Sequence, residues 1–428
     1  MKKITSLTII FTYLFITYHA FAQQKTDNIV VVLSMDAFRW DYDDLIGTPN
    51  LDKIAEEGVR VEKWQPCFPS ITFPNHYAMA TGLYPNNNGL VHNTFFNKTL
   101  NKEYRVGKRE TVEDGRFYKG EPIWNTVHNQ GLIAYNFFWV GSEAEIDSVP
   151  RDSWKLFKPN KEYSYEQRID SIIKWLKMPS EIRPSLIMFY FEDPDGITHY
   201  DHPSAGQKTK AIVKRCDSLV GTLFEQIKQL PNAENIHLLI VSDHGMCPIN
   251  IKRTVHLRDY INENSIEYAN WGSPVAIFDI KSQYLDETLH TLQNVAHISA
   301  WKSSEVPKRL HYGSNPDIGN LVVLADSAWR LSEFSFEEEK ERFKKRFSLS
   351  EKEFEEFCNS DLLGAHGFDN ENGDMYGIFY AWGKEFKKNY SYPVLLNIQL
   401  YNVICKILNI QPAQNDGNFE EILNIFEK

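Results

Sequence analysis

The chain has 428 residues, of which 42% are hydrophobic and 24% are charged, and its formal net charge is −11. This length exceeds a usual single domain, so we expect one large domain with an insertion, or two domains. An acidic chain is a poor binder of nucleic-acid backbone, so we expect no nucleic-acid polymer as a partner. A small anionic substrate would need a local positive centre, which a metal ion could supply.

The N-terminus has the pattern of an export signal. Lys2 and Lys3 precede an apolar run from Leu7 to about Ile16, and Ala20-Phe21-Ala22 fits a small-x-small cleavage site. Residues 1–22 therefore predict a signal peptide, and we expect export to the periplasm or the extracellular space. An uncleaved anchor is the alternative, although the run is short for a membrane span. After cleavage we expect no membrane span, and the sequence indicates no obligate protein partner.

Strand and helix patterns alternate along most of the chain. Strand patterns occur at 28–38, 131–140, 185–195 and 236–245, and helical patterns lie between them at 48–58, 165–177 and 208–230. Such alternation predicts an α/β fold with a largely parallel sheet and helices on both faces. Another strand is expected at 375–382, and a final helix at Val394–Leu408.

The region around 252–360 has a different pattern and is expected to be an inserted or capping part of a catalytic domain spanning 23–428. Short strand patterns occur at 274–280 and 319–326, with few strong helices between them. The densely charged segment "FEEEKERFKKRFSLSEKEFEEF" carries a stripe of phenylalanines and predicts a solvated amphipathic helix. The five cysteines are widely spaced and include no CxxC pair, which argues against a zinc finger and leaves disulfide pairing open.

Metal-type ligands follow three of the predicted strands. Because chemistry in open α/β sheets lies at the carboxyl ends of strands, these ligands should meet at one edge. A fourth cluster is His366 in "GAHGFDN". The six candidates are Asp36, Asp195, His199, Asp243, His244 and His366. A lone strand-end aspartate is usually a cap or turn former, so the prediction depends on the clusters together.

Carboxylate and imidazole ligands without thiolate suit catalytic Zn²⁺. Six protein ligands are too many for one tetrahedral ion with an open position, but they provide three ligands for each of two zinc ions. Two metals about 4 Å apart can hold both oxygens of an in-line displacement at phosphorus. We therefore expect two Zn²⁺ ions.

Thr72 lies among Pro66, Pro69 and Pro74, directly before an apolar helical pattern. A hydroxyl is a weak nucleophile at neutral pH, but a bound metal can activate it. At a helix start, free N–H groups would favour an incoming phosphoryl group. The alternative is that Thr72 only caps the helix.

The segment "PSITFPNHYAMATGLYPNNNGLVHN" resembles the nucleophile segment of the nucleotide pyrophosphatase/phosphodiesterase (type I phosphodiesterase) family, within the alkaline phosphatase superfamily. Further blocks resemble the family in the same order: "FWVGSEAEIDSVPR", "YFEDPDGITH", "VSDHGM", "GAHGFDN" and "MYGIFYAWG". The resemblance covers most of 28–386. It implies an alkaline-phosphatase-like fold and a hydrolase that cleaves phosphodiester or pyrophosphate bonds of nucleotides and releases a nucleoside 5′-monophosphate.

The resemblance also implies roles for individual residues. Asp195, His199 and His366 would hold one zinc ion, whereas Asp36, Asp243 and His244 would hold the other beside Thr72. Thr72 would form a covalent phosphothreonine intermediate, and the side-chain amide of Asn93 would bind a phosphoryl oxygen. The chain departs from the family pattern at Thr198 and in "HYDHP" after it, which could reshape the pocket mouth without removing a ligand.

The choice of substrate is less constrained. A monoesterase needs an extra cation for its dianionic substrate. The nucleophile and ligand segments contain no obvious one, and the nearest candidate is Arg39, three residues after Asp36. We therefore favour a diester. In nucleotide-cleaving relatives, aromatic residues near the positions of Phe73 and Tyr190 stack on the base. A phospholipid or choline-phosphate diester, a phosphomonoester and a phosphonate remain alternatives, as does a zinc-stabilised binding protein without activity.

Overall fold

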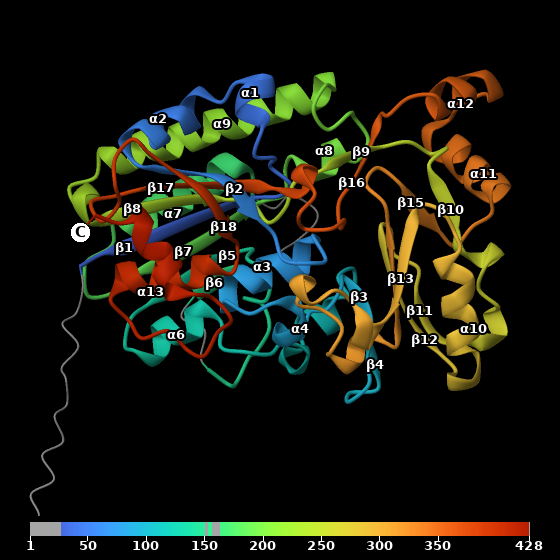
Figure 1. Ribbon diagram of the computed structural model, residues 1–428. Coiled ribbons are helices and arrows are strands. Elements are labelled where there is room, and N and C mark those ends of the chain that lie inside the picture. Colours follow the sequence, from blue (N-terminus) through green and yellow to red (C-terminus); the bar gives the residue numbers. More distant parts are fainter. Residues whose placement is uncertain (1–26, 150–152, 156–162, 428) are drawn as a thin grey trace, which may run out of the picture.

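The computed structural model describes residues 27–149, 153–155 and 163–427 (Figure 1). The predicted signal peptide at 1–22 lies outside these residues. Within the described part, no helix combines the length and apolar character that a membrane crossing requires. All five cysteines fall in this part, and each is buried with a free thiol.

An eight-stranded sheet forms the centre of the molecule, in the order β18-β2-β17-β8-β1-β7-β5-β6. Its neighbours pair in parallel, except that β17 runs antiparallel to both β2 and β8. The predicted α/β fold with a largely parallel sheet is therefore confirmed. The strands are β1 Ile29–Met35, β2 Val59–Gln65, β5 Ala134–Phe137, β6 Ser153–Lys155, β7 Leu186–Phe191, β8 Ile236–Val241, β17 Gly377–Trp382 and β18 Tyr390–Leu396.

Helices cover both faces of this sheet because its central strand is apolar on both sides. Val30 and Val32 of β1 pack into one core cluster with α3, α6 and α13, whereas Val31 and Leu33 pack into the other with α2, α7 and α9. Figure 1 shows α2 and α9 on the side of the sheet opposite α13 and α6. The helices of this part are α1 Tyr42–Ile46, α2 Pro49–Glu57, α3 Thr72–Thr81, α4 Pro85–Asn88, α5 Arg109–Val112, α6 Ile123–Asn129, α7 Tyr165–Leu176, α8 Asp195–Thr198, α9 Gln207–Lys228, α13 Gln399–Leu408 and α14 Phe419–Ile422.

A four-stranded antiparallel sheet with the order β11-β12-β14-β13 lies within the region predicted to be inserted. It has its own core cluster, which includes Phe278, Leu292 and Val323. Its strands are β11 Ile266–Asn270, β12 Val275–Ile280, β13 Ile298–Lys302 and β14 Leu321–Ala325, and its helices are α10 Ser282–Gln293, α11 Phe336–Phe347 and α12 Glu351–Cys358. That this region is an insertion that caps the catalytic domain stays a prediction.

Three two-stranded pairs complete the sheets. The antiparallel pair of β9 and β16 joins the segment after β8 to the segment before His366, with Cys247 opposite Ala365. This pairing brings two distant histidine-bearing loops together. The pairs are β9 Cys247–Ile249 with β16 Leu363–Ala365, β10 Thr254–His256 with β15 Arg330–Ser332, and β3 Thr94–Asn97 with β4 Lys102–Arg105.

Two predictions of secondary structure were wrong. The final helix begins at Gln399 and not at Val394, because β18 pairs in parallel with β2 and extends the sheet through Leu396. The charged segment forms two helices, because Ser348 has a φ of 55° and Ser350 starts a new helix with a capping box.

Candidate active site

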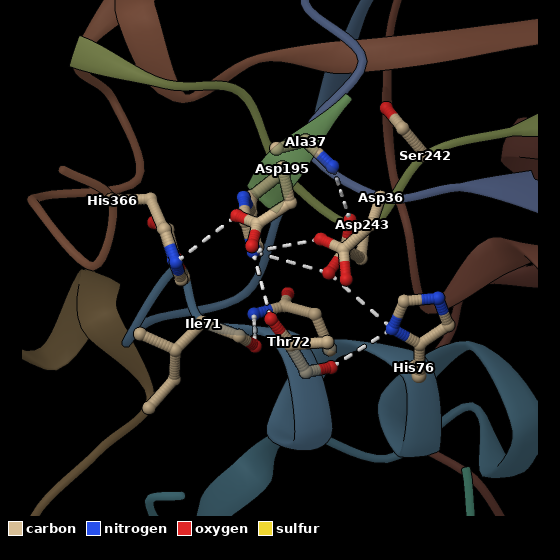
Figure 2. Close-up of polar contacts among 12 residues, drawn as sticks. Asp36, Ala37, Ile71, Thr72, His76, Asp195, Ser242, Asp243 and His366 are labelled. Carbon is tan, nitrogen blue, oxygen red and sulfur yellow. Dashed lines mark hydrogen bonds and ion pairs between the residues drawn. The ribbon is translucent and has the colours of Figure 1, made fainter. Parts of the chain in front are cut away.

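Acidic side chains follow three adjacent strands at one edge of the central sheet. Asp36 follows β1, Asp243 follows β8, and Asp195 starts α8 after β7. Since the sheet order is β8-β1-β7, these strand ends are neighbours. Figure 2 shows the three carboxylates pointing toward Thr72 at the start of α3. The structure thus brings together segments that are far apart in sequence, as the strand-end pattern predicted.

The turn after β1 ties the three strand ends together. Ala37 has a φ of 56°, a left-handed conformation that is uncommon for a residue other than glycine. In this conformation its N–H donates to Asp243 Oδ1 at 3.1 Å. The Asp195 N–H donates to the Asp36 carbonyl at 3.2 Å. Backbone donors therefore hold the strand ends close to each other, while one oxygen of each carboxylate stays free of such bonds.

The three candidate histidine ligands each have a backbone carbonyl next to Nδ1. His199 Nδ1 lies 3.0 Å from the Gly364 carbonyl, and His244 Nδ1 lies 2.8 Å from the Gly245 carbonyl. His366 Nδ1 lies 3.1 Å from the carbonyl of Ser70. A carbonyl can only accept, so each Nδ1 carries a proton and each Nε2 faces the carboxylates. This arrangement is typical of histidines that bind a metal through Nε2. Burial lowers the pKa of His199, but Asp195 beside it raises that pKa to about 9, so a metal at this Nε2 would displace a proton.

These Nε2 atoms and the carboxylates form two clusters. Asp195, His199 and His366 place ligand atoms within 4.8 Å of one another, and so do Asp36, Asp195 and His244. Asp195 is thus common to both groups. Asp243 belongs to the second cluster by proximity, since its Oδ2 lies 3.1 Å from His244 Nε2. All six residues predicted as ligands are therefore gathered in one place.

Each carboxylate has a buried oxygen without a hydrogen-bond partner among the described residues. The three oxygens are Asp36 Oδ1, Asp195 Oδ1 and Asp243 Oδ2. A buried polar atom without a partner is costly, and three such acceptors in one place are a pattern that cations would satisfy. The residues present therefore fit bound metal.

The electrostatics of the cluster support the same conclusion. Burial, with repulsion from Asp243 and Asp195, raises the pKa of Asp36 well above its usual value. Burial also raises the pKa of Asp243 to about 8. Burial would raise the pKa of Asp195 too, but His199 beside it holds that pKa below its usual value. The protein's own cations thus leave two of the three carboxylates uncompensated.

Thr72 is the first residue of α3 and lies beside this cluster. Its Oγ1 is 3.3 Å from His244 Nε2. Ile71 is the N-cap, and its apolar side chain cannot accept a hydrogen bond from the helix. The Thr72 N–H therefore has no acceptor in the described part of the chain. Asn75 fixes the preceding loop, because its amide donates to the carbonyls of Pro69 and Ile71, both at 2.9 Å. The prediction that Thr72 lies at a helix start is confirmed.

Asn93 is held next to Thr72 by a hydrogen bond from Phe73, the residue after Thr72. Its Oδ1 accepts the Phe73 N–H at 3.2 Å. The acceptor end of the amide is therefore fixed, and Nδ2 makes no hydrogen bond to another described residue. Two donors, this Nδ2 and the Thr72 N–H, are left free at the same helix start. Phe73 itself is partly buried, and its ring packs edge-on against Tyr104 at 6.5 Å.

Tyr190 contacts a candidate metal ligand directly. Its hydroxyl donates to Asp36 Oδ2, and its ring packs edge-on against His76 with centroids 5.1 Å apart. The side chain is partly buried. This contact to Asp36 was not predicted, and base stacking by Tyr190 stays a prediction.

His76 is a residue of the site that sequence reasoning missed. Its Nε2 lies 2.9 Å from Ser34 Oγ, and its Nδ1 lies 3.0 Å from the Thr72 carbonyl and 3.3 Å from Asp243 Oδ2. It therefore links β1, the start of α3 and one candidate ligand. The position four residues after Thr72, on the same face of a helix, was the available signal.

Arg39 does not point into the site. Its guanidinium is buried and donates to both oxygens of Asp41, to Asp374 and to the Met246 carbonyl. The guanidinium is therefore engaged by two carboxylates and a carbonyl. The nearest candidate for a clamp on a dianionic phosphate is therefore engaged elsewhere.

The departures from the family pattern flank the candidate ligand His199. Thr198 is fully buried and donates to the Asp195 carbonyl at 3.0 Å, so its side chain supports α8. Tyr200 is 48% exposed and follows the candidate ligand His199 directly. The guanidinium of Arg346, on α11, lies 4.5 Å from the centre of the Tyr200 ring. The changed segment thus connects the site to the inserted region.

Known proteins resemble this chain over nearly its whole length. A family model described as type I phosphodiesterase/nucleotide pyrophosphatase matches residues 30–369. The human ectonucleotide pyrophosphatase/phosphodiesterase family member 1 is 30% identical over 398 residues, which are 90% of this chain and 40% of that protein. Venom phosphodiesterase 2 of Crotalus adamanteus is 30% identical over 402 residues, 91% of this chain and 46% of that protein. The chain therefore spans less than half the length of these curated relatives.

Solved structures share the fold. Murine ectonucleotide pyrophosphatase/phosphodiesterase 5, in an inactive threonine-to-alanine form in complex with AMP, superposes with a TM-score of 0.82 at 27% identity, over 94% of this chain and all of that chain. The human counterpart gives a TM-score of 0.81 at 28% identity, with the same coverage of both chains. The alkaline-phosphatase-like α/β architecture is thus confirmed, and the chain belongs to the type I phosphodiesterase/nucleotide pyrophosphatase family.

Proposed function

We propose that this protein is a hydrolase that cleaves phosphodiester or pyrophosphate bonds of nucleotides and releases a nucleoside 5′-monophosphate. One observation carries the proposal: the Thr72 hydroxyl, Oγ1, lies at a helix start beside six metal-type side chains. Of those side chains, the three aspartates each keep a buried oxygen without a partner. Membership of the family supports the reaction class.

The cofactors would be two Zn²⁺ ions. Asp195, His199 and His366 would hold one ion, whereas Asp36, Asp243 and His244 would hold the other beside Thr72. The donor set, with oxygen and imidazole nitrogen but no sulfur, suits catalytic zinc. When bound, the ions would supply positive charge that favours the ionised Thr72 hydroxyl and neutralises the phosphoryl oxygens.

The chain's own residues would do the rest in two steps. In the first, the Thr72 hydroxyl gives up its proton to solvent and Oγ1 forms a bond to phosphorus, while the bond from phosphorus to the leaving oxygen breaks. This gives a phosphothreonine and the freed leaving group. Asn93 Nδ2 and the Thr72 N–H donate to a non-bridging oxygen as its charge grows. In the second, water adds to the same phosphorus and the bond to Thr72 Oγ1 breaks, which releases the monophosphate and restores the hydroxyl.

The environment of Arg39 favours a diester over a monoester. A monoester dianion has three free oxygens and benefits from an additional cation. Four of the five N–H groups of Arg39 already donate to two carboxylates and a carbonyl, which holds the guanidinium on these partners. A diester has one negative charge and two free oxygens, so it needs no cation beyond the proposed metal ions.

A nucleotide is the substrate that the relatives favour. The matching family is described as nucleotide pyrophosphatases, and a similar solved structure holds AMP. In this chain Phe73 and Tyr190 would contact the base. The names of the relatives, ectoenzymes and venom enzymes, also agree with export of this chain to the periplasm or the extracellular space.

A substrate panel on one purified sample tests the proposal. We expect turnover of the p-nitrophenyl ester of thymidine 5′-monophosphate to exceed that of p-nitrophenyl phosphate and p-nitrophenyl phosphorylcholine. Thr72→Ala should abolish turnover while the metal content stays the same. A preference for the monoester or the choline ester, or full turnover by Thr72→Ala, would contradict the proposal.

A further inference from the structure

The segment that carries Asn93 is held by a side chain of the inserted region. Asn270, the last residue of β11, reaches this segment with one amide nitrogen. Its Nδ2 lies 2.8 Å from His92 Nδ1 and donates to the Thr94 carbonyl at 2.7 Å. His92 and Thr94 are the residues directly before and after Asn93. A single amide therefore bridges the two neighbours of the proposed phosphoryl-oxygen donor.

The amide of Asn270 is itself fixed by the turn that follows β11. Its Oδ1 accepts the Gly272 N–H at 3.1 Å, so Nδ2 is the end of the amide that faces His92. A Cβ on Gly272 would lie 3.0 Å from the His92 ring and 2.6 Å from the Val275 carbonyl oxygen. The turn is thus packed directly on the ring. Since β11 pairs with β12, the inserted sheet sets the orientation of the Asn270 amide.

His92 is the other half of this contact. The side chain is buried, and its Nδ1 also accepts the Thr94 N–H at 3.3 Å. Because Nδ1 accepts from N–H donors, the proton of the ring lies on Nε2 and the ring is neutral. A hydrogen bond to the Val275 backbone also joins the ring to the inserted region. The His92 ring is therefore held at the boundary between Asn93 and the inserted sheet.

Asn93 makes few contacts of its own that would fix its position. Its Oδ1 accepts the Phe73 N–H at 3.2 Å, and its carbonyl accepts the Val106 N–H at 3.1 Å. The direction in which Nδ2 points then depends on the segment at 92–94. Misplacement of a catalytic group by about 1 Å can lower a rate about 10²-fold, so the contacts of this segment matter for the reaction.

We propose that His92 and Asn270 are positioning residues, which hold Asn93 where its Nδ2 meets the non-bridging phosphoryl oxygen. The inference depends on the proposed function, because both residues act through Asn93. Neither would touch the substrate. Since Asn270 belongs to β11, the inserted region contributes to the reaction through this contact.

The first test is steady-state hydrolysis of the p-nitrophenyl ester of thymidine 5′-monophosphate. Asn270→Ala removes the bridging amide, and His92→Phe keeps a ring but removes both nitrogens. We expect each variant to lower kcat about tenfold and to change KM less than about twofold, because the Asn93 donor acts mainly in the transition state. His92→Asn should bring kcat back to within about threefold of the wild type, because its Oδ1 is an acceptor as many bonds from Cα as Nδ1 of histidine.

A double-mutant cycle shows whether the effect passes through Asn93. In an Asn93→Ala background, Asn270→Ala should lower kcat by less than about twofold further, because residues that act through one group are not additive. If Asn270→Ala lowered kcat by the same factor with and without the Asn93 amide, the inference would be overturned.

Asn97→Ala is the matched control. It removes another amide that joins the same hairpin to the inserted region, where it donates to Asp317 at 2.6 Å. In urea unfolding both Asn97→Ala and Asn270→Ala should lose stability, whereas only Asn270→Ala should lower kcat by more than about threefold. An equal fall in kcat in both variants would show a general docking effect and overturn the inference.

The inference is also overturned if Asn270→Ala and His92→Phe both keep kcat within about twofold of the wild type. Failure of the proposed function would look different, because the wild-type protein would then not hydrolyse the diester. In that case the inference would fall together with the proposed function.

Discussion

The amide of Asn93 offers a sharp test, because its two ends do different things. Oδ1 accepts the Phe73 N–H at 3.2 Å, which leaves Nδ2 as one of two free donors beside Thr72. Asn93→Asp keeps an acceptor for Phe73 but replaces the donor with a negative charge. Asn93→Ala removes both ends. The two variants therefore separate the catalytic part of the side chain from the structural part.

The expected magnitudes follow from this geometry. Loss of one of two preorganised donors to a developing oxyanion costs about 3–4 kcal/mol, so kcat should fall about 10²–10³-fold in both variants. Asn93→Ala also leaves the partly buried Phe73 N–H unpaired, which should lower the free energy of unfolding by about 1 kcal/mol. Asn93→Asp should not, because a carboxylate at a helix start is favourable.

The assay is steady-state hydrolysis of the aryl nucleotide diester, together with urea unfolding of each variant. Asn97→Ala serves as the control, since the Asn97 amide donates to Asp317 at 2.6 Å and lies away from Thr72. It should lower stability while kcat stays within about threefold. If Asn93→Asp kept kcat within threefold of the wild type, the assigned role of Nδ2 would be refuted.

Two further outcomes follow from buried histidines. His76→Ala should weaken zinc binding 10–100-fold in a competition titration, because His76 orients Asp243; an unchanged affinity would contradict this role. Burial lowers the pKa of His237 to about 4, so between about pH 6.5 and 4 the unfolded chain binds the proton and the folded chain does not. The protein should therefore lose stability as the pH falls through this window. His237→Phe should reduce the loss between pH 7 and pH 5 by about 2 kcal/mol in urea unfolding, without weakening zinc binding. An unchanged pH dependence would show that the pKa of His237 is not lowered in the fold.

The candidate ligands could be predicted because they occupy strand ends. An apolar run that ends in an acid has a simple physical meaning in a parallel sheet, and the β8-β1-β7 order brings Asp36, Asp195 and Asp243 together. His366 follows no strand of this sheet. It reaches the site because β16 pairs with β9, a tertiary contact that no local pattern reveals. The role of Asn93 likewise came from resemblance alone.

Errors arose where tertiary pairing or capping overrode a local pattern. Val394–Leu396 follow a proline and precede a helix, yet they pair with β2 at the edge of the sheet, where a proline is tolerated. The break between α11 and α12 could have been found, because Ser350 and Glu353 form a capping box in the sequence itself. The contact between Tyr190 and Asp36 depends on the register of β1 against β7, which sequence does not fix.

A metal count on the purified protein tests the central claim most directly. The account predicts two zinc ions per chain by elemental analysis, and about one in Asp195→Ala or His366→Ala, with turnover lost in both variants. Fewer than two ions in the active wild-type protein, or two ions retained in both variants, would contradict it.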